Sequence, residues 1–379
     1  MPPKRVTGKK TPTKVGGNKR TSIQTDVQED TGGGGSRLQN PQNVAGKVKV
    51  AKCATNARAE VEKWARRALD KGVNGLREEF AELRRYAPAD MKVDTFVANW
   101  DAGRNRYKDV PCQEKFRVVL KWPNQQHDYI HANYVSTPIS EKRFICTQGP
   151  LDCTITDFWH MVIQEESDSL IMLCNTKEKG MEKCAQYWPL EEKEVQKYGD
   201  VEVGNLAVRP LTVDEPNIRV STLCVRWMNG NDRKERVIRH YQYLDWPDRG
   251  VPSTRLTVMV LLSYVRGTTK PIVVHCSAGI GRTGSIVAIE FILERMQSGI
   301  PCEAMDEILK ELRNQRPYSI QNDLVSLQSY SDPSCLQQYL YVHRIILFYF
   351  IEKYRVGSES EEIQNKYKKF IEEYDKATA

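Results

Sequence analysis

The sequence predicts an α/β fold, in which a β-sheet carries helices on its faces. Two observations support this class. Short apolar runs bounded by turn residues are typical of strands, and segments with apolar residues every three or four positions, typical of helices, alternate with them. The length of 379 residues and the hydrophobic fraction of 40% suit one large domain with a single core.

The expected elements follow one another in mixed order. Strand-like runs occur at 117–120, 144–146, 170–173, 218–227, 237–244 and 272–275. Helical patterns occur at 154–165, 255–265, 283–298, 303–315 and 338–353. Before them, the periodicity from Ala57 onward predicts two packed helices separated near 72–75. The last segment, 356–379, predicts a charged helix with one apolar side, an accessory packing element.

The positive charge of the chain belongs to its first residues. The formal net charge is +7, and residues 1–50 hold ten Lys and Arg against three Asp and Glu. Residues 1–56 are polar and glycine-rich, which predicts a disordered basic tail. We predict a solvated spacer without a specific nucleic-acid partner. Nuclear import, or weak contact with RNA or an anionic membrane surface, is the alternative.

Cysteine and histidine usage predicts a chain without metal or cofactor. The ten cysteines form no C-x-x-C pair, and the six histidines show no H-E-x-x-H spacing. Scattered cysteines are typical of reduced thiols, so we expect a cytoplasmic or nuclear location. No run approaches 18 consecutive apolar residues, which predicts no transmembrane segment. We expect a monomer.

One segment combines a nucleophile with an anion-binding loop. An apolar strand at 272–275 leads into Cys276, a loop containing Gly279 and Gly281, and Arg282 at the start of a helix. Such a loop can point successive N–H groups at one tetrahedral anion, toward the positive end of the helix. This setting favours the thiolate over the thiol. The segment therefore predicts attack by Cys276 on a phosphate that Arg282 clamps through two hydrogen bonds.

Two other interpretations of this segment are weaker. Gly279, Gly281 and Gly284 also match the dinucleotide pattern G-x-G-x-x-G. That site requires a second strand ending in an acid about 20 residues later, whereas 301–315 has a helical pattern. Alternatively, Cys276 is an ordinary buried core residue. The histidine before it, the glycines and Arg282 together favour the phosphate site.

From His275 to Gly284 the chain resembles the protein-tyrosine phosphatase family, which is phosphotyrosine-specific and cysteine-dependent, and in particular its single-domain non-receptor members. Further blocks of the family occur in the same order at 104–110, 128–133, 147–151, 157–159, 178–189 and 246–252. The resemblance covers residues 57–355, the expected phosphatase domain. It implies a twisted mixed sheet flanked by helices, hydrolysis of phosphotyrosine through a cysteinyl-phosphate, a role in signalling, and phosphotyrosine-containing proteins as partners.

The resemblance also implies roles for particular residues. Asp248 would be the general acid and later the general base, Thr283 would help the sulfur to leave, and Gln321 would position the attacking water. Glu178 would orient Arg282. Substrate binding would involve Tyr107, which stacks on the ring and excludes phosphoserine, Asp109, which accepts hydrogen bonds from the peptide backbone, Gln338, and the loop residues Ser277, Ala278, Gly279, Ile280 and Gly281.

Two departures from the family pattern stand out. His131 occupies a position where the family usually has Asn. Gln338 follows Gln321 by seventeen positions instead of the usual four, which implies an insert at 324–336. Its serines and Asp332-Pro333 predict an irregular loop, so we expect Gln321 to reach the site and Gln338 to be displaced from it. A weakly active or inactive phosphotyrosine-binding module is therefore the alternative function. A redox or arsenate-reducing cysteine enzyme is a third, although it would not need Tyr107 or Asp248.

Overall fold

The computed structural model describes residues 42–83, 86–248, 250–254, 256–302, 304–320 and 333–378, with the side chains of 42–56 and 333–335 left out. The chain divides into two units, Met1–Ala45 and Gly46–Ala379. Of the first unit only Gln42–Ala45 are described, and they are helical. Helix thus begins well before residue 57, where the sequence predicted the ordered chain to start, and residues 1–41 of the predicted tail lie outside the described residues.

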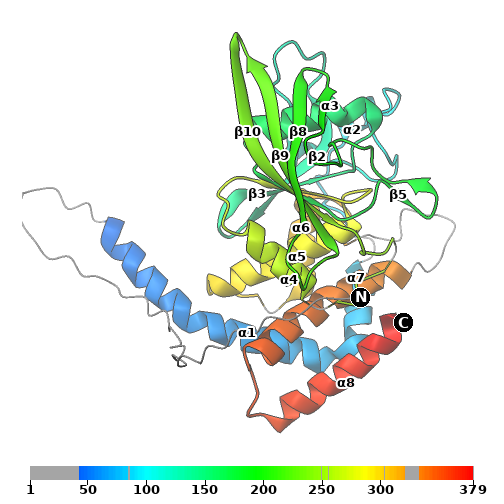
Figure 1. Cartoon of the computed structure of the whole chain (residues 1–379). Coiled ribbons are helices and arrows are strands. Elements are labelled where there is room, and N and C mark those ends of the chain that lie inside the picture. Colours follow the sequence, from blue (N-terminus) through cyan, green and yellow to red (C-terminus); the bar gives the residue numbers. More distant parts are fainter. Residues whose placement is uncertain are drawn as a thin grey trace, which may run out of the picture. The chain divides into compact units, whose positions relative to one another are not determined.

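A nine-stranded mixed sheet organises the second unit (Figure 1). Its four central strands, in the order β3, β11, β4 and β10, are parallel, and the outer pairs are antiparallel. In spatial order the strands are β1 (Arg117–Val119), β2 (Tyr129–Thr137), β3 (Ser140–Thr147), β11 (Ile272–His275), β4 (Ser169–Met172), β10 (Asp232–Tyr243), β9 (Ile218–Asn229), β8 (Val201–Pro210) and β7 (Val195–Tyr198). Strands β5 (Lys177–Glu178) and β6 (Met181–Glu182) form a separate hairpin.

Helices flank this sheet, as the sequence predicted. Helix α5 packs against β2, β3 and β11, and α3 packs against β8. The helices are α1 (Gln42–Leu83), α2 (Asp94–Ala98), α3 (Ile155–Gln164), α4 (Thr257–Val265), α5 (Gly281–Gln297), α6 (Met305–Gln315), α7 (Pro333–Leu347) and α8 (Glu361–Thr378), with short 3-10 turns at Glu114–Phe116 and Asp152–Thr154. None of the described helices combines the length and apolar character needed to cross a membrane.

The second half of α1 lies beside α7 and α8, through Trp64 and Asp70, and α7 packs on α8. Figure 1 shows the three helices on the same side of the sheet. The predicted break in the first helical segment is confirmed at Gly72, whose φ of 57° interrupts α1. The Trp64 ring stacks on His343 of α7 with centroids 5.2 Å apart. Arg344 of α7 donates to the Tyr367 hydroxyl of α8 over 2.7 Å. The predicted C-terminal helix therefore packs into the same buried cluster as the rest of the second unit.

The predicted insert differs from expectation where it is described. Residues 321–332 lie outside the described residues, but Pro333–Leu336 form the first turn of α7 instead of a loop. Proline suits this position, because the first turn of a helix needs no N–H donor from it. After Leu347 the chain continues as a π-helical segment, Phe348–Lys353. The sequence did not predict strands β2, β7 and β8.

Buried histidines are a further feature of the core. His131, His240 and His343 are each at most 2% exposed. Burial lowers the pKa of His131 to about 3, and the neighbouring Arg316 guanidinium adds to the effect. Burial also lowers the pKa of His343, to about 4, and that of His240. All three side chains are therefore neutral in the folded protein near pH 7.

Neutral buried histidines make the folded state sensitive to acid. In the unfolded chain a histidine binds a proton near pH 6.5, whereas folded His131 does not until about pH 3. Stability is therefore complete above pH 6.5 and falls as the pH drops below it. For His131 the loss between pH 7 and pH 5 should be about 2 kcal/mol. Urea unfolding of the unsubstituted chain and of His131→Asn at both pH values measures it, and the variant should lose about 2 kcal/mol less. Equal losses would contradict the neutral assignment.

Candidate active site

The nucleophile candidate Cys276 follows the most protected strand of the sheet. All four residues of β11 are buried, between the parallel neighbours β3 and β4. Cys276 is the next residue, at the carboxyl end of β11, and is 4% exposed. Ligands of such parallel sheets bind at this end of the strands. The short apolar run Ile272–His275, which forms a buried central strand, therefore positions the Cys276 thiol at this end of the sheet.

The loop after Cys276 can turn tightly because Gly279 has no side chain. Gly279 has a φ of 70°, and a Cβ there would lie 2.0 Å from the Thr147 carbonyl oxygen. The Gly279 N–H donates to the Cys276 sulfur over 3.2 Å. Helix α5 begins two residues later, so its positive end lies beside the same loop. Both features stabilise negative charge on the sulfur or on a bound anion.

A buried arginine that the sequence analysis missed holds this loop from outside. Arg316 donates to the Gly279 carbonyl over 3.1 Å and to the Ala278 carbonyl over 3.0 Å. It also donates to the Asn133 side chain over 3.0 Å. Anchored carbonyls pointing away from the cavity leave the neighbouring N–H groups free to point into it. No spacing relates Arg316 to the loop in sequence, so only the fold reveals its part in the site.

His131 connects this arginine to the opposite wall of the site. Its Nδ1 lies 3.3 Å from Arg316, and because arginine only donates, this nitrogen accepts. The proton is therefore on Nε2, which donates to the Val110 carbonyl over 2.8 Å. One neutral imidazole thus joins the segment containing Tyr107 to the anion loop. His131, which stands where the family usually has Asn, therefore lies behind the wall that contains Tyr107.

Arg282 is fixed by a two-pronged ion pair with Glu178. The two N–H···O distances are 2.6 and 2.8 Å, and Arg282 also donates to the Trp246 carbonyl over 3.1 Å. Burial opposes the charge of Arg282, but the Glu178 hydrogen bonds and the nearby Cys276 raise its pKa above the usual value. The guanidinium is therefore a permanent, oriented cation beside the sulfur.

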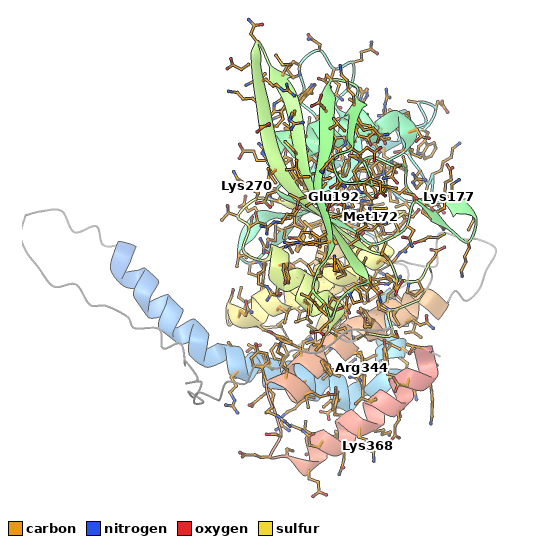
Figure 2. The ribbon with its side chains drawn as sticks, in the orientation of Figure 1. Met172, Lys177, Glu192, Lys270, Arg344 and Lys368 are labelled. Carbon is orange, nitrogen blue, oxygen red and sulfur yellow. The ribbon has the colours of Figure 1, made fainter. Side chains whose placement is uncertain are left out.

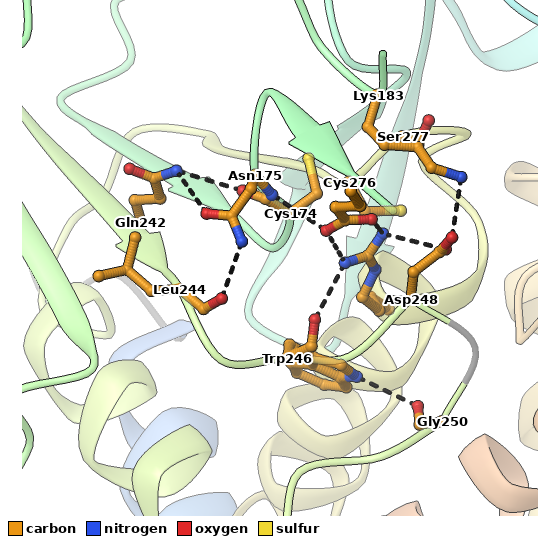
Figure 3. A network of polar contacts seen from close by, with 12 residues as sticks. Cys174, Asn175, Lys183, Gln242, Leu244, Trp246, Asp248, Gly250, Cys276 and Ser277 are labelled. Atoms are coloured by element: carbon orange, nitrogen blue, oxygen red, sulfur yellow. Dashed lines mark hydrogen bonds and ion pairs between the residues drawn. The ribbon is translucent and has the colours of Figure 1, made fainter. Parts of the chain in front are cut away.

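Asp248 faces both cations of the site (Figure 3). Its carboxylate lies 2.9 Å from the Lys183 amine and 3.6 Å from the Arg282 guanidinium. The loop that carries Asp248 starts at the buried Trp246, whose indole donates to the Gly250 carbonyl over 3.4 Å. A carboxyl group is thereby held beside the anion loop, on a segment anchored by an aromatic ring.

These groups line one cavity of about 290 Å³. Its wall is formed by Tyr107, Val110, Met181, Lys183, Asp248, Cys276, Ser277, Ala278, Gly281, Arg282 and Gln338. The Tyr107 hydroxyl lies 2.8 Å from the Ser277 hydroxyl, which ties the wall to the loop. Arg106 donates to the Gly149 and Pro150 carbonyls over 3.0 and 2.7 Å, so the backbone next to Tyr107 is anchored.

The structure brings most of the predicted site residues together. Gly279 and Ile280 complete the loop, and Glu178 lies behind Arg282. Asp109 is exposed and does not line the cavity. The expectation that Gln338 is displaced was wrong: it lines the cavity, is 4% exposed, and its Oε1 has no hydrogen-bond partner among the described residues. The first turns of α7 carry it there. Gln321 lies outside the described residues.

Thr283 is another predicted site residue whose side chain lacks a hydrogen-bond partner among the described residues. It is fully buried at the start of α5, and within the described part of the chain nothing bonds to its hydroxyl oxygen. No hydrogen bond joins the Thr283 hydroxyl to the Cys276 sulfur, and its role in helping the sulfur to leave stays a prediction. Among the described residues, no three His, Cys, Asp or Glu side chains gather in a way that could hold a metal ion.

Comparison with known proteins places this site in a family. The profile of the protein-tyrosine phosphatase family matches residues 101–331. The chain is 34% identical over 269 residues to tyrosine-protein phosphatase non-receptor type 9 of mouse and of human, which covers 65% of this chain and 44% of either relative. It thus spans less than half the length of these relatives.

Solved structures agree with this assignment. The catalytic domain of human protein tyrosine phosphatase non-receptor type 18 superposes with a TM-score of 0.63 and 25% identity, over 76% of this chain and 99% of that one. PTPN18 in complex with HER2 phosphopeptides superposes with a TM-score of 0.66 and 26% identity, over 78% of this chain and 99% of that one. The fold, the ordered sequence blocks and the matched profile agree, and the chain belongs to the protein-tyrosine phosphatase family.

Proposed function

We propose that this chain hydrolyses phosphotyrosine in proteins through a cysteinyl-phosphate intermediate on Cys276. The observation that carries the proposal is the meeting of three groups in one cavity. These are the buried Cys276 thiol at the end of β11, a fixed guanidinium from Arg282, and the carboxyl group of Asp248. The complex of PTPN18 with HER2 phosphopeptides supports phosphotyrosine proteins as the substrate class.

Binding would begin with the phosphate. Its oxygens accept hydrogen bonds from the loop amides and from Arg282, whose orientation is already set by Glu178. A dianion entering beside Asp248 repels an ionised carboxylate and so works against the attraction that Lys183 and Arg282 exert on it. The proposed mechanism takes Asp248 to be protonated in this complex. The proton that catalysis requires is thereby placed next to the leaving group.

The first chemical step is a displacement at phosphorus. The Cys276 sulfur forms a bond to phosphorus as the bond from phosphorus to the tyrosine oxygen breaks. Asp248 gives its proton to that oxygen, so tyrosine leaves as a neutral phenol. Arg282 and the loop amides stabilise the charge on the three remaining oxygens.

The second step releases phosphate. Water attacks phosphorus, Asp248 now accepts the proton, and the sulfur leaves as thiolate. The Gln338 Oε1 lines the cavity without a hydrogen-bond partner among the described residues, which supports a role as acceptor of a hydrogen bond from that water. The Thr283 hydroxyl, which has no hydrogen-bond partner in the described part of the chain, is one residue beyond Arg282 and would donate to the departing thiolate after a rotamer change.

Selectivity for tyrosine would come from the height of the Tyr107 wall. A phosphorylated ring can stack on Tyr107 while its phosphate reaches Cys276, whereas a short phosphoserine side chain would not reach it. The alternative, a weakly active or inactive phosphotyrosine-binding module, was motivated by the insert at 324–336. Gln338, which follows the insert, lines the cavity, and this supports turnover over binding alone. The eight described cysteines form no disulfide, which supports action in a reducing compartment such as the cytoplasm, in signalling by phosphotyrosine.

Cys276→Ser should abolish turnover while binding is kept. We expect hydrolysis of an aryl phosphate to fall at least about 1,000-fold, because the poorer serine nucleophile cannot form the intermediate. Affinity for a phosphotyrosine peptide, measured by calorimetry, should stay within a few-fold, since Arg282 and the loop amides remain. Cys153→Ser, at an exposed cysteine, is the control and should turn over normally. Substantial turnover by Cys276→Ser would exclude the covalent step.

Asp248→Ala should slow poor leaving groups more than good ones. A phenol with a high pKa needs the proton as its bond breaks, and general acids contribute about 100- to 10,000-fold. For a series of aryl phosphates, the rate of the variant should therefore fall most for those whose leaving phenol has the highest pKa. The exposed Asp232→Ala is the control. Equal losses along the series would remove Asp248 from the acid role.

A further inference from the structure

The short β5–β6 hairpin forms one edge of the cavity mouth. Lys177 pairs with Glu182, and Glu178 pairs with Met181. The two residues between the strands, Lys179 and Gly180, have φ values of 49° and 79°, as a two-residue hairpin turn of the primed type requires. The hairpin is separate from the nine-stranded sheet, and Lys177 lies on it at one side of the domain (Figure 2).

The pairing of this hairpin decides which side chains face the active site. Residues directly opposite in an antiparallel pair share one face. Glu178 points at Arg282 and is held there by two hydrogen bonds of 2.6 and 2.8 Å. Its partner Met181 must therefore lie on the cavity side, as does Lys183 two residues later, which contacts Asp248. The ion pair that orients Arg282 also fixes the position of Met181.

The opposite face of the hairpin carries charged side chains in solvent. Lys177 and Glu182 are 71% and 73% exposed and lie 3.7 Å apart. Met181 is different: it lines the catalytic cavity and is nonetheless 56% exposed. A long apolar side chain thus stands half in water at the mouth of a polar cavity, on a backbone that the catalytic residues hold in place.

We propose that Met181 is a specificity-determining residue that binds an apolar side chain next to the phosphotyrosine of the substrate. This inference rests on the proposed function, because it takes the cavity to hold the phosphotyrosine itself. The flexible, polarizable thioether adapts to aliphatic and aromatic partners of different shape. Contact with such a side chain would remove apolar surface of both partners from water.

The test measures peptide binding to the full chain carrying Cys276→Ser, so that no turnover occurs. Three phosphotyrosine peptides are compared by calorimetry, identical except for Leu, Asp or Gly on both sides of the phosphotyrosine. We expect the Leu peptide to bind about five-fold more tightly than the Gly peptide. Adding Met181→Ala should remove that difference, and Met181→Leu should retain it.

Met228→Ala is the matched control. Met228 is 55% exposed at the end of β9, outside the cavity wall, and its substitution should preserve the Leu-to-Gly ratio. The proposal is overturned if Met181→Ala weakens all three peptides equally, if the ratio is unchanged, if the Asp peptide binds best, or if no peptide binds. Turnover of the Leu peptide by the unsubstituted chain is measured separately. If the Leu-to-Gly affinity ratio behaves as expected but the Leu peptide is not turned over, hydrolysis is refuted and recognition by Met181 stands. If turnover is normal but Met181→Ala leaves the affinity ratio unchanged, recognition by Met181 is refuted and hydrolysis stands.

Discussion

The site depends on the direction in which the backbone N–H and carbonyl groups of the loop after Cys276 point. For the loop after Cys276 to turn N–H groups toward an anion, its carbonyls must face outward, and buried carbonyls need donors of their own. Arg316 supplies these donors to Ala278 and Gly279, and the missing side chain of Gly279 allows the loop to lie against Thr147. The anion cradle therefore depends on residues that touch no substrate, which lie on β3 and beyond the end of α6.

Charge balance explains why the cavity needs both Glu178 and Asp248. Arg282 and Lys183 are two cations close together in a mostly buried wall. Glu178 offsets Arg282 permanently and uses both oxygens to fix its direction. Asp248 bridges Lys183 and Arg282 more loosely, at 2.9 and 3.6 Å. The carboxylate with the fixed hydrogen bonds suits orientation, and the carboxylate on a loop suits proton transfer, because only the second can change its ionisation without releasing Arg282.

The sequence predicted what is local along the chain and missed what depends on distant contacts. Cys276 and Arg282 lie six positions apart in one strand, loop and helix, so their meeting follows from spacing. Strand β2 was missed because His131 and Asn133 interrupt its apolar pattern. Both are buried since they bond to Arg316, a partner no local pattern reveals. The position of Gln338 was wrong for a related reason: counting inserted residues ignored that α7 begins at Pro333 and carries Gln338 into the cavity.

The cavity combines two kinds of unfavourable surface, one in its interior and one at its mouth. Inside, Gln338 buries an oxygen without a partner among the described residues, which typically costs about 1–3 kcal/mol. At the mouth, Met181 holds apolar surface in water. Water or a ligand inside relieves the first cost, and an apolar neighbour relieves the second. A phosphorylated tyrosine flanked by an apolar residue would relieve both costs at once, so the proposed hydrolysis and the proposed specificity would each be favoured by surface that the free chain leaves unsatisfied.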